Sequence, residues 1–165
     1  MLTRFIERLR VPTIAQGNKA IPYLPKFKQA RVISVYDGDT ITIARKTSIW
    51  WRSTIHSYKV RLSGIDCPEI RGSLPEEKEY ALKAKSIVEN LVLNQVVKLD
   101  IKGFDKYGRI LAIILVNEIN LSEHLLSIGL AVPYHGKTKI KVDWKGLYTS
   151  KSLSFSDKDS QTIKL

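Results

Sequence analysis

The sequence predicts a small, mainly β domain in which short strands form a closed or nearly closed barrel, with a long helix between two of them. Five β-rich runs lie over residues 30–36, 40–43, 59–64, 96–101 and 110–116. One amphipathic helical pattern separates the third run from the fourth. The 165 residues, 44% of them hydrophobic, suffice for one core and make two domains improbable. A barrel removes the sheet edges that an open meander would expose.

The first two runs predict a hairpin. Side chains alternate along residues 30–36, Asp37-Gly38 is a frequent turn pair, and Thr40-Ile41-Thr42-Ile43 follows at once. Residues 45–58 interpose a longer connection before the third strand, and this connection carries Trp50-Trp51. The tryptophan pair is compatible with a stacking platform for single-stranded bases and equally with a packed hairpin cap.

Two helices are indicated by spacing and by capping residues. Ser73 with Glu76 forms a capping box ahead of a helix over about residues 74–93, whose apolar face recurs every three to four residues. Asn120 with Glu123 forms a second capping box, for a short helix that ends at Gly129. After Tyr134 the periodicity fades, and we expect irregular chain there.

Charge divides the chain into three parts. The net charge is +11, and both ends are basic while the centre is nearly balanced. We expect a basic N-terminal arm over residues 1–27, one domain over residues 28–148, and a flexible basic C-terminal tail over residues 149–165. A positive surface attracts polyanions, such as nucleic acid or an anionic membrane.

The sequence offers no sign of secretion or of a membrane span. Cys67 is the single cysteine, so no internal disulfide can form, and no apolar run reaches the length that a span needs. We expect an intracellular, cytoplasmic protein. Residues 1–12 form an amphipathic, arginine-rich pattern, which suits a surface arm and alternatively an organellar presequence or an interfacial membrane helix.

Three carboxylates and two arginines lie in short segments at the ends of predicted strands: Asp39, Asp66, Glu69, Arg61 and Arg109. Phosphodiester hydrolysis requires a hard cation held by oxygen ligands, a carboxylate near the attacking water, and guanidinium groups on the phosphate. Each segment alone also suits an ordinary turn or a solvated surface. Only their combination indicates metal-assisted cleavage.

These segments together resemble one known family. The ordered motifs Val35-Tyr36-Asp37-Gly38-Asp39-Thr40, Arg61-Leu62-Ser63-Gly64-Ile65-Asp66-Cys67-Pro68-Glu69, Asp105-Lys106-Tyr107-Gly108-Arg109 and Gly129-Leu130-Ala131 closely resemble the staphylococcal nuclease (thermonuclease) family over about residues 30–135. The resemblance implies an OB-fold, five-stranded β-barrel with two or three helices. It also implies calcium-dependent hydrolysis of DNA and/or RNA with little sequence specificity, leaving 3′-phosphate and 5′-hydroxyl ends.

The resemblance also implies roles for single residues. Asp39, Asp66 and the backbone carbonyl of Cys67 would bind Ca²⁺. Glu69 would position or deprotonate the attacking water. Arg61 and Arg109 would hold the phosphate and offset the charge of the transition state.

Nucleotide binding is implied at two tyrosines. Tyr107 matches a tyrosine near the terminal phosphate of the bound nucleotide, and Tyr134 lies close to the tyrosine on which a base stacks. Trp50 and Trp51, in a connection longer than that of the best known member, add a candidate binding surface. The last helix of the family has no recognisable counterpart after Tyr134.

Two function classes follow from these observations. The first is an enzyme, an endonuclease that hydrolyses ester bonds. The second is a non-catalytic nucleic-acid or protein binding module, as in the degenerate nuclease-like domains of some RNA regulators. Such domains usually lack several of the carboxylates and arginines, whereas this chain has all five. The sequence therefore favours the enzyme.

Overall fold

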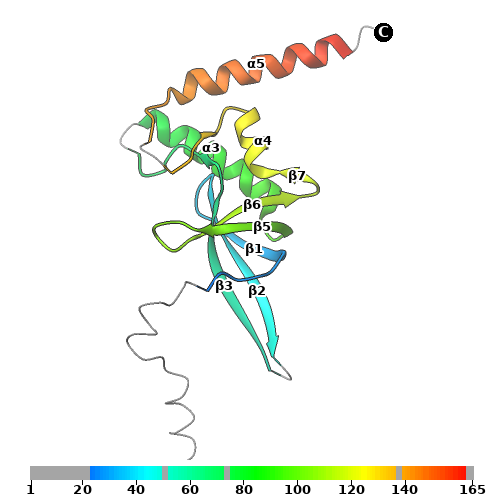
Figure 1. The fold of residues 1–165 in the computed structure, drawn as a ribbon. Helices are drawn as coiled ribbons and strands as arrows, with labels where there is room; N and C mark the ends of the chain where they lie inside the picture. Colours follow the sequence, from blue (N-terminus) through cyan, green and yellow to red (C-terminus); the bar gives the residue numbers. More distant parts are fainter. Residues whose placement is uncertain (1–22, 50–51, 73–74, 137–138, 163–165) are drawn as a thin grey trace, which may run out of the picture.

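The computed structural model describes residues 23–49, 52–72, 75–136 and 139–162. Within them, five strands form a closed barrel and three helices lie around one end of it (Figure 1). The barrel strands are β1 (Gln29–Val35), β2 (Thr40–Ile49), β3 (Arg52–Leu62), β5 (Val96–Phe104) and β6 (Ile110–Val116). The predicted α+β, OB-like barrel is thus confirmed.

The barrel closes where β3 meets β6. Strand β1 pairs antiparallel with both β2 and β5. Strand β2 also pairs antiparallel with β3, and β5 pairs antiparallel with β6. The closing pair is parallel, with Val60 opposite Ile110 and Leu62 opposite Ala112. Since every barrel strand then has two neighbours, no barrel edge is left open over this stretch.

The core follows the alternation of the strands. Ile41, Ile43 and Val60 are fully buried, and the buried residues of β6 alternate along its length. The helix α3 (Pro75–Val92) adds a buried face that includes Ala84 and Val88. The prediction of this helix is confirmed to within one residue at each described end, while its proposed cap Ser73 lies outside the described residues.

The short helix α4 (Leu121–Ser127) is also confirmed, with one difference in its cap. The Asn120 side chain accepts a hydrogen bond from the Ser122 amide at 3.1 Å, as an N-cap should. The Glu123 carboxylate, however, accepts from the Asn120 side-chain amide and not from its backbone N–H. The helix ends before Gly129, which has a φ of 73°.

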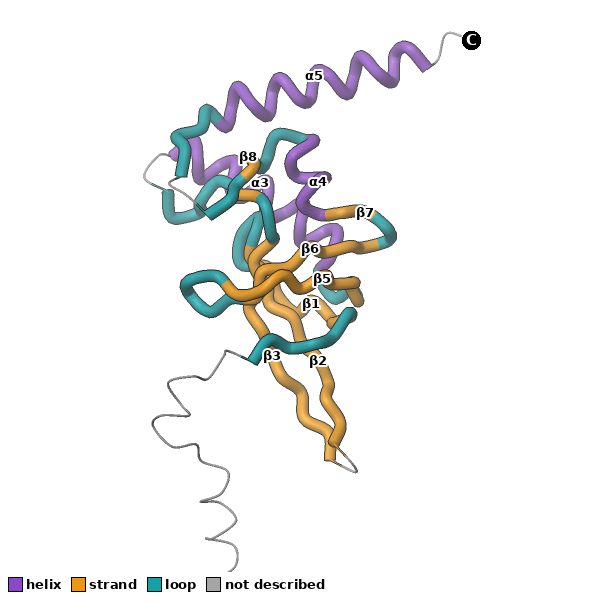
Figure 2. Tube along the Cα trace, in the orientation of Figure 1, coloured by secondary structure: helices purple, strands orange, loops and turns teal. Residues whose placement is uncertain are grey.

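The connection that we expected over residues 45–58 is wrong, because this segment continues the hairpin. Strands β2 and β3 stay paired without a bulge from Thr40 opposite Arg61 to Ile49 opposite Arg52. The hairpin extends beyond the barrel, away from the helices (Figures 1 and 2). Each strand supplies the backbone partners of the other, and the Thr and Ile residues of this segment favour extended backbone. Trp50 and Trp51 lie outside the described residues.

The irregular chain that we expected after Tyr134 is also wrong in part, because helix α5 spans Trp144–Thr162. Asp143 caps it by accepting from the Gly146 amide at 3.0 Å. Trp144 is buried in the core, and the ring of Tyr148 lies 5.6 Å from that of Tyr80 on α3. The α5 helix crosses the domain boundary predicted at residue 148.

The predicted N-terminal arm, residues 1–27, lies largely outside the described residues. At its end, the ring of Phe27 packs 5.4 Å from the ring of Tyr58 on β3. Two short strands, β4 (Ile65–Asp66) and β8 (Val132–Pro133), pair with each other beside the barrel, while β7 (Ile119–Asn120) pairs antiparallel with the end of β6. The β4–β8 pair holds the chain after Asp66 against the chain before Tyr134.

Candidate active site

The candidate site lies on the outer wall of the barrel, where β2 begins and β3 ends. Thr40 and Arg61 are directly opposite each other in the β2–β3 register, and the Leu62 amide donates to the Asp39 carbonyl at 2.8 Å. Side chains alternate along β3, so Arg61 points outward between the buried Val60 and Leu62. Asp39 and Arg61, 22 positions apart in the sequence, are therefore neighbours.

The guanidinium of Arg61 contacts the two carboxylates among the predicted metal ligands. Its Nη1 pairs with the Asp39 carboxylate, and its Nη2 donates to Asp66 at 2.7 Å. Asp39 and Asp66 are 4% and 6% exposed, so both charges are shielded from water and each has a cationic partner. Burial alone would lower the pKa of Arg61, but the two carboxylates outweigh it and raise that pKa above its usual value.

Cys67 contributes its backbone to the site. Its amide donates to the Asp39 carboxylate at 3.3 Å, although 28 positions separate the two residues. Burial, followed by the nearby Asp39 charge, raises the pKa of the Cys67 thiol well above its usual range. The thiol therefore stays protonated at neutral pH.

Arg109 reaches the same wall from the β5–β6 turn. Its Nε donates to the Asp105 carboxylate at 2.6 Å, and its Nη1 donates to the Thr40 hydroxyl at 3.1 Å. The Thr40 hydroxyl in turn donates to Asp39 at 2.8 Å. A continuous chain of hydrogen bonds thus joins the turn to the carboxylates, and it fixes the direction of the Arg109 side chain.

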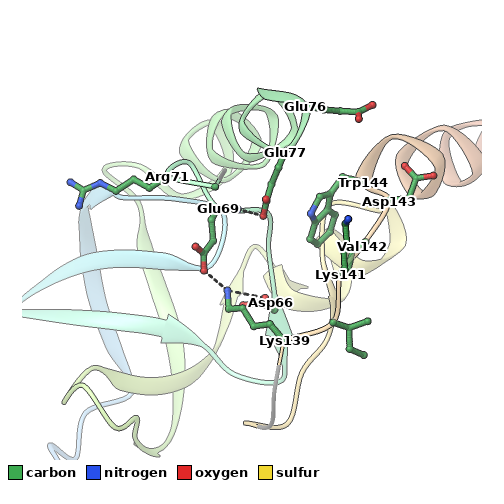
Figure 3. A pocket seen from close by; sticks show the side chains of 12 residues that line it. Asp66, Glu69, Arg71, Glu76, Glu77, Lys139, Lys141, Val142, Asp143 and Trp144 are labelled. Atoms are coloured by element: carbon green, nitrogen blue, oxygen red, sulfur yellow. Dashed lines mark hydrogen bonds and ion pairs between the residues drawn. The ribbon is translucent and has the colours of Figure 1, made fainter. Parts of the chain in front are cut away.

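Glu69 reaches the site through a lysine that we did not predict. The Lys139 ammonium lies 3.0 Å from the Asp66 carboxylate and also pairs with the Glu69 carboxylate (Figure 3). Burial alone would lower the pKa of Lys139, but the bonds to Glu69 and Asp66 outweigh it and raise that pKa above 10.5. The Glu69 amide donates at 3.2 Å to Glu77, in the first turn of α3. The side chain of Glu69 is 54% exposed, so water can reach it.

Asp37 adds a further negative charge beside the site. Its carboxylate accepts from the Asp39 amide at 3.1 Å. Burial, and then the neighbouring Asp39 charge, raise the pKa of Asp37 to about 6. Crowding of carboxylates in a partly buried place leaves the site attractive to a cation.

The two predicted nucleotide-binding tyrosines lie beside the two arginines. The Tyr134 ring centre is 5.8 Å from Arg61 Cζ, and the Tyr107 ring centre is 5.6 Å from Arg109 Cζ. Tyr107 is 72% exposed at the tip of its turn. Trp50 and Trp51, the other predicted binding residues, lie outside the described part of the chain and are not placed relative to the site.

The donors fit a hard cation by type but leave many coordination positions open. Within the described residues, no group of three or more His, Cys, Asp or Glu side chains is arranged to hold a metal ion. Asp39, Asp66 and the Cys67 carbonyl supply oxygens only. Ca²⁺ takes six to eight oxygen ligands, so water and phosphate oxygens would have to complete its shell.

The sequence analysis missed three residues of this arrangement. Lys139 lies in a segment without a recognisable pattern, and no local signal marks it. Glu77 reads simply as an acidic residue that favours the start of a helix. Thr40 reads as a strand residue of the first motif, and only the barrel shows that its hydroxyl links Arg109 to Asp39.

Comparison with known proteins gives a family match. The model of the staphylococcal nuclease homologue family matches residues 59–150, from the middle of β3 into α5. This match covers Arg61, Asp66, Glu69 and Arg109, and it extends past Tyr134 to the helix that the sequence analysis did not find.

Curated relatives match parts of the chain, and two of the three described here are named as nucleases. An uncharacterized endonuclease of Haemophilus influenzae is 33% identical over 63% of this chain and 51% of its own length. An uncharacterized protein of Methanocaldococcus jannaschii is 32% identical over 67% of this chain and 61% of its own length. The thermonuclease of Staphylococcus hyicus is 30% identical over 61% of this chain and 56% of its own length. The chain thus spans about half to three-fifths of the length of these relatives.

Proposed function

Because the chain belongs to the staphylococcal nuclease homologue family, we propose that it is an endonuclease that hydrolyses phosphodiester bonds of DNA and/or RNA with the help of calcium. The observation that carries the proposal is the position of Arg61. Two buried carboxylates from different elements, Asp39 and Asp66, meet on its one guanidinium. A barrel that only bound nucleic acid would have no need of two buried anions beside a phosphate-binding arginine, because anions repel the backbone.

Arg61 and Arg109 would hold the scissile phosphate from two sides. A guanidinium presents several donors in one plane and stays charged, so it suits phosphate oxygens on which negative charge builds up. The bonds that fix Arg109 to Asp105 and Thr40 use its Nε and Nη1. Its Nη2 makes no hydrogen bond to a described residue and can donate to a phosphate oxygen.

Glu69 would act on the attacking water. Its carboxylate is half exposed and comes three residues after Asp66 in the sequence, on the chain that leaves β4. A general base must be within hydrogen-bond reach of the proton that it takes. The bond from the Glu69 amide to Glu77 ties the backbone of Glu69 to α3 and limits where its carboxylate can lie.

Asp39, Asp66 and the Cys67 carbonyl would hold the calcium ion. A calcium ion held there would supply positive charge next to the phosphate on which negative charge builds up. In the described structure the positive charges of Arg61 and Lys139 neutralise these carboxylates. These ion pairs hold the carboxylates in place.

The decisive experiment is cleavage of four substrates, single- and double-stranded DNA and RNA, each with calcium and with excess EGTA. We expect cleavage with calcium and none with EGTA, and 3′-phosphate with 5′-hydroxyl ends on the products. Full activity in EGTA would overturn the calcium requirement. Binding without cleavage under every condition would overturn the enzyme and leave a binding module.

None of the described helices combines the length and apolar character needed to cross a membrane. The predicted cytoplasmic location stays a prediction.

A further inference from the structure

The β2–β3 hairpin has two faces, one continuous with the core of the barrel and the other with the candidate active site. Directly paired residues of antiparallel strands share a face, so the buried pair of Ile41 and Val60 marks the face turned to the core. Thr40 and Arg61 mark the opposite face, which carries the candidate active site. Outward from the site, the successive pairs on that same face are Thr42 with Lys59, Ala44 with Ser57, and Lys46 with Ile55.

This outward face is basic and its cations are available. Lys46 and Lys59 are exposed, and the sequence has no Asp or Glu from residue 40 to residue 62. Lys98 of β5, by contrast, is neutralised by Glu118 at 2.6 Å. Among the residues that the structure describes, Lys46 and Lys59 take part in no ion pair. Their charges therefore remain free to attract a polyanion.

The charges lie along a line that starts at the active site. A strand rises about 3.4 Å per residue, so Lys59 follows Arg61 by about 7 Å and the Lys46–Ile55 pair follows by about 14 Å more. The hairpin is only two strands wide and extends away from the barrel (Figure 2). Ile55 is 71% exposed beside Lys46, which places an apolar side chain where a base could pack. A row of cations with an apolar contact suits a linear polyanion that carries bases.

We propose that this face, defined by Lys46, Ile55 and Lys59 and called the hairpin track, binds the backbone of one nucleic-acid strand that passes through the site at Arg61. The inference rests on the proposed function, because it takes nucleic acid as the substrate. A nucleic acid fits better than an anionic membrane, since the cations form one line continuous with a phosphate-binding arginine. A membrane-binding surface would need a broader apolar face.

The track is tested by binding in EGTA, where no cleavage is expected. A fluorescein-labelled oligothymidylate of 12 nucleotides is titrated with wild type, with the double variant Lys46→Gln/Lys59→Gln, and with Arg45→Gln, over a range of salt concentrations. Arg45 is the matched control: it is exposed and adjacent to Lys46, but on the other face, where it pairs with His56. In the wild type, Arg45 Nη1 donates to the Gln29 carbonyl at 3.0 Å.

The double variant should bind the oligonucleotide about tenfold more weakly at low salt, and its log–log salt slope should fall by about 1.4, or 0.7 for each lost phosphate contact. Arg45→Gln should stay within about twofold of wild type. Equal losses in the two variants would show unspecific attraction and overturn the track. An unchanged affinity of the double variant, or no binding by wild type, would also overturn it.

A second arm uses vesicles of phosphatidylcholine with phosphatidylserine. If the double variant loses vesicle binding but keeps oligonucleotide binding, the track belongs to a membrane and the proposal is overturned. The cleavage assay with calcium is separate, because the binding assay needs neither metal nor turnover. If the wild type cleaves nucleic acid but the double variant binds the oligonucleotide normally, the hairpin track is overturned and the proposed enzyme is not. If binding depends on the hairpin track but no cleavage occurs, the proposed enzyme is overturned and the track is not.

Discussion

Glu69 differs from the other carboxylates of the site in its exposure. Asp39 and Asp66 are buried against Arg61. The Glu69 side chain, by contrast, is 54% exposed and forms an ion pair with the long, flexible side chain of Lys139. A buried carboxylate that accepts bonds from several partners suits the binding of a cation, and an accessible carboxylate suits contact with a water molecule. The different environments of these residues therefore favour different roles.

Glu69→Gln should lower turnover by about 10² or more, because the amide keeps the shape of the side chain but cannot accept a proton. The measurement is kcat on a single-stranded oligonucleotide with saturating calcium. Glu76→Gln is the control, since Glu76 is an exposed carboxylate that lines the same pocket as Glu69, between the start of α3 and residues 139–143. Turnover of the Glu69 variant within threefold of wild type would remove this residue from the chemistry.

Asp105→Asn should weaken the fold and release Arg109. Asp105 accepts from the Tyr107 and Arg109 amides and from Arg109 Nε, at 2.9, 2.8 and 2.6 Å. Burial alone would raise the pKa of Asp105, but the bonds from Arg109 and Tyr107 outweigh it and lower that pKa below 3.8. We expect a loss of about 1–2 kcal/mol in the free energy of unfolding at pH 7, measured by urea denaturation.

The loss should depend on pH in a defined direction. A carboxyl with a lowered pKa in the folded state stabilises the protein above its unfolded pKa, and this contribution disappears as the pH falls through the folded pKa. The difference between wild type and Asp105→Asn should therefore be full above about pH 4 and shrink below it. Asp100→Asn, in an exposed pair with Lys102, should change stability by less than about 0.5 kcal/mol. A difference that grows toward low pH would contradict this account.

The segment before α5 places a cation on the site. Residues 139–143 connect to the buried Trp144, and this anchor holds Lys139 near Asp66 and Glu69 (Figure 3). The same segment and the start of α3 enclose a pocket of about 420 Å³ that includes both carboxylates. A divalent cation that binds Asp66 must compete with the Lys139 ammonium.

Lys139→Met should therefore raise the affinity for Ca²⁺ by about two- to fivefold, because a competing charge in a half-exposed ion pair contributes up to about 1 kcal/mol. The measurement is calorimetric titration of the protein with calcium, without nucleic acid. Lys141→Met is the control, since Lys141 lies two residues along the same segment and lines the pocket. Weaker calcium binding by the Lys139 variant, or an equal gain in the control, would show that Lys139 does not compete.

Helix α5 illustrates why an element can be missed in a sequence. Its local signals are present: Asp143 is a capping residue, and Trp144, Leu147 and Tyr148 follow helical spacing. They are confined to the first turns, and the Ser-, Asp- and Lys-rich residues beyond them suggest irregular chain. Packing decides the outcome. Gly129, just after the end of α4, lies so close to α5 that an added Cβ would be 2.7 Å from the Leu147 carbonyl oxygen.

At the scale of the whole molecule, helix α3 packs closely against the barrel at the turn between β1 and β2. Gly38 allows this fit, because a Cβ there would lie 2.8 Å from the Ala84 Cβ on α3 and 3.0 Å from the Cys67 sulfur. The turn sequence Asp37-Gly38 predicts a hairpin correctly. Its glycine is required by close packing against α3 and Cys67, which no local rule reveals.

Gly38→Ala should cost about 1–3 kcal/mol of unfolding free energy, as overpacking in a dense core does. It should also weaken calcium binding, because the turn that carries Asp39 must move away from α3. Urea denaturation and calcium titration measure the two effects. Gly136→Ala is a partial control, since no atom lies within 4 Å of its added Cβ, although its φ of 81° adds local strain. If the Gly38 variant were as stable as the wild type, α3 would be able to move away from the added methyl group at little cost in free energy.

The sequence by itself determined most of the local elements and the family of the chain. Periodicity and capping residues located α3, α4 and most of the strands, because side-chain spacing and propensity act over a few residues. The motifs around Asp39, Asp66 and Arg109 determined the family, and the family match confirms this. For these features, no contact between distant parts of the chain had to be known.

Only the tertiary structure decided which distant residues meet. Parallel pairing of β3 with β6 closes the barrel. That closure sets the β5–β6 turn beside β2, so that Arg109 reaches Thr40 across 69 positions of sequence. The docking of α5 likewise brings Lys139 onto Asp66 and Glu69. Such contacts depend on the free energy of packing whole elements together, which is not encoded in any short stretch of the chain.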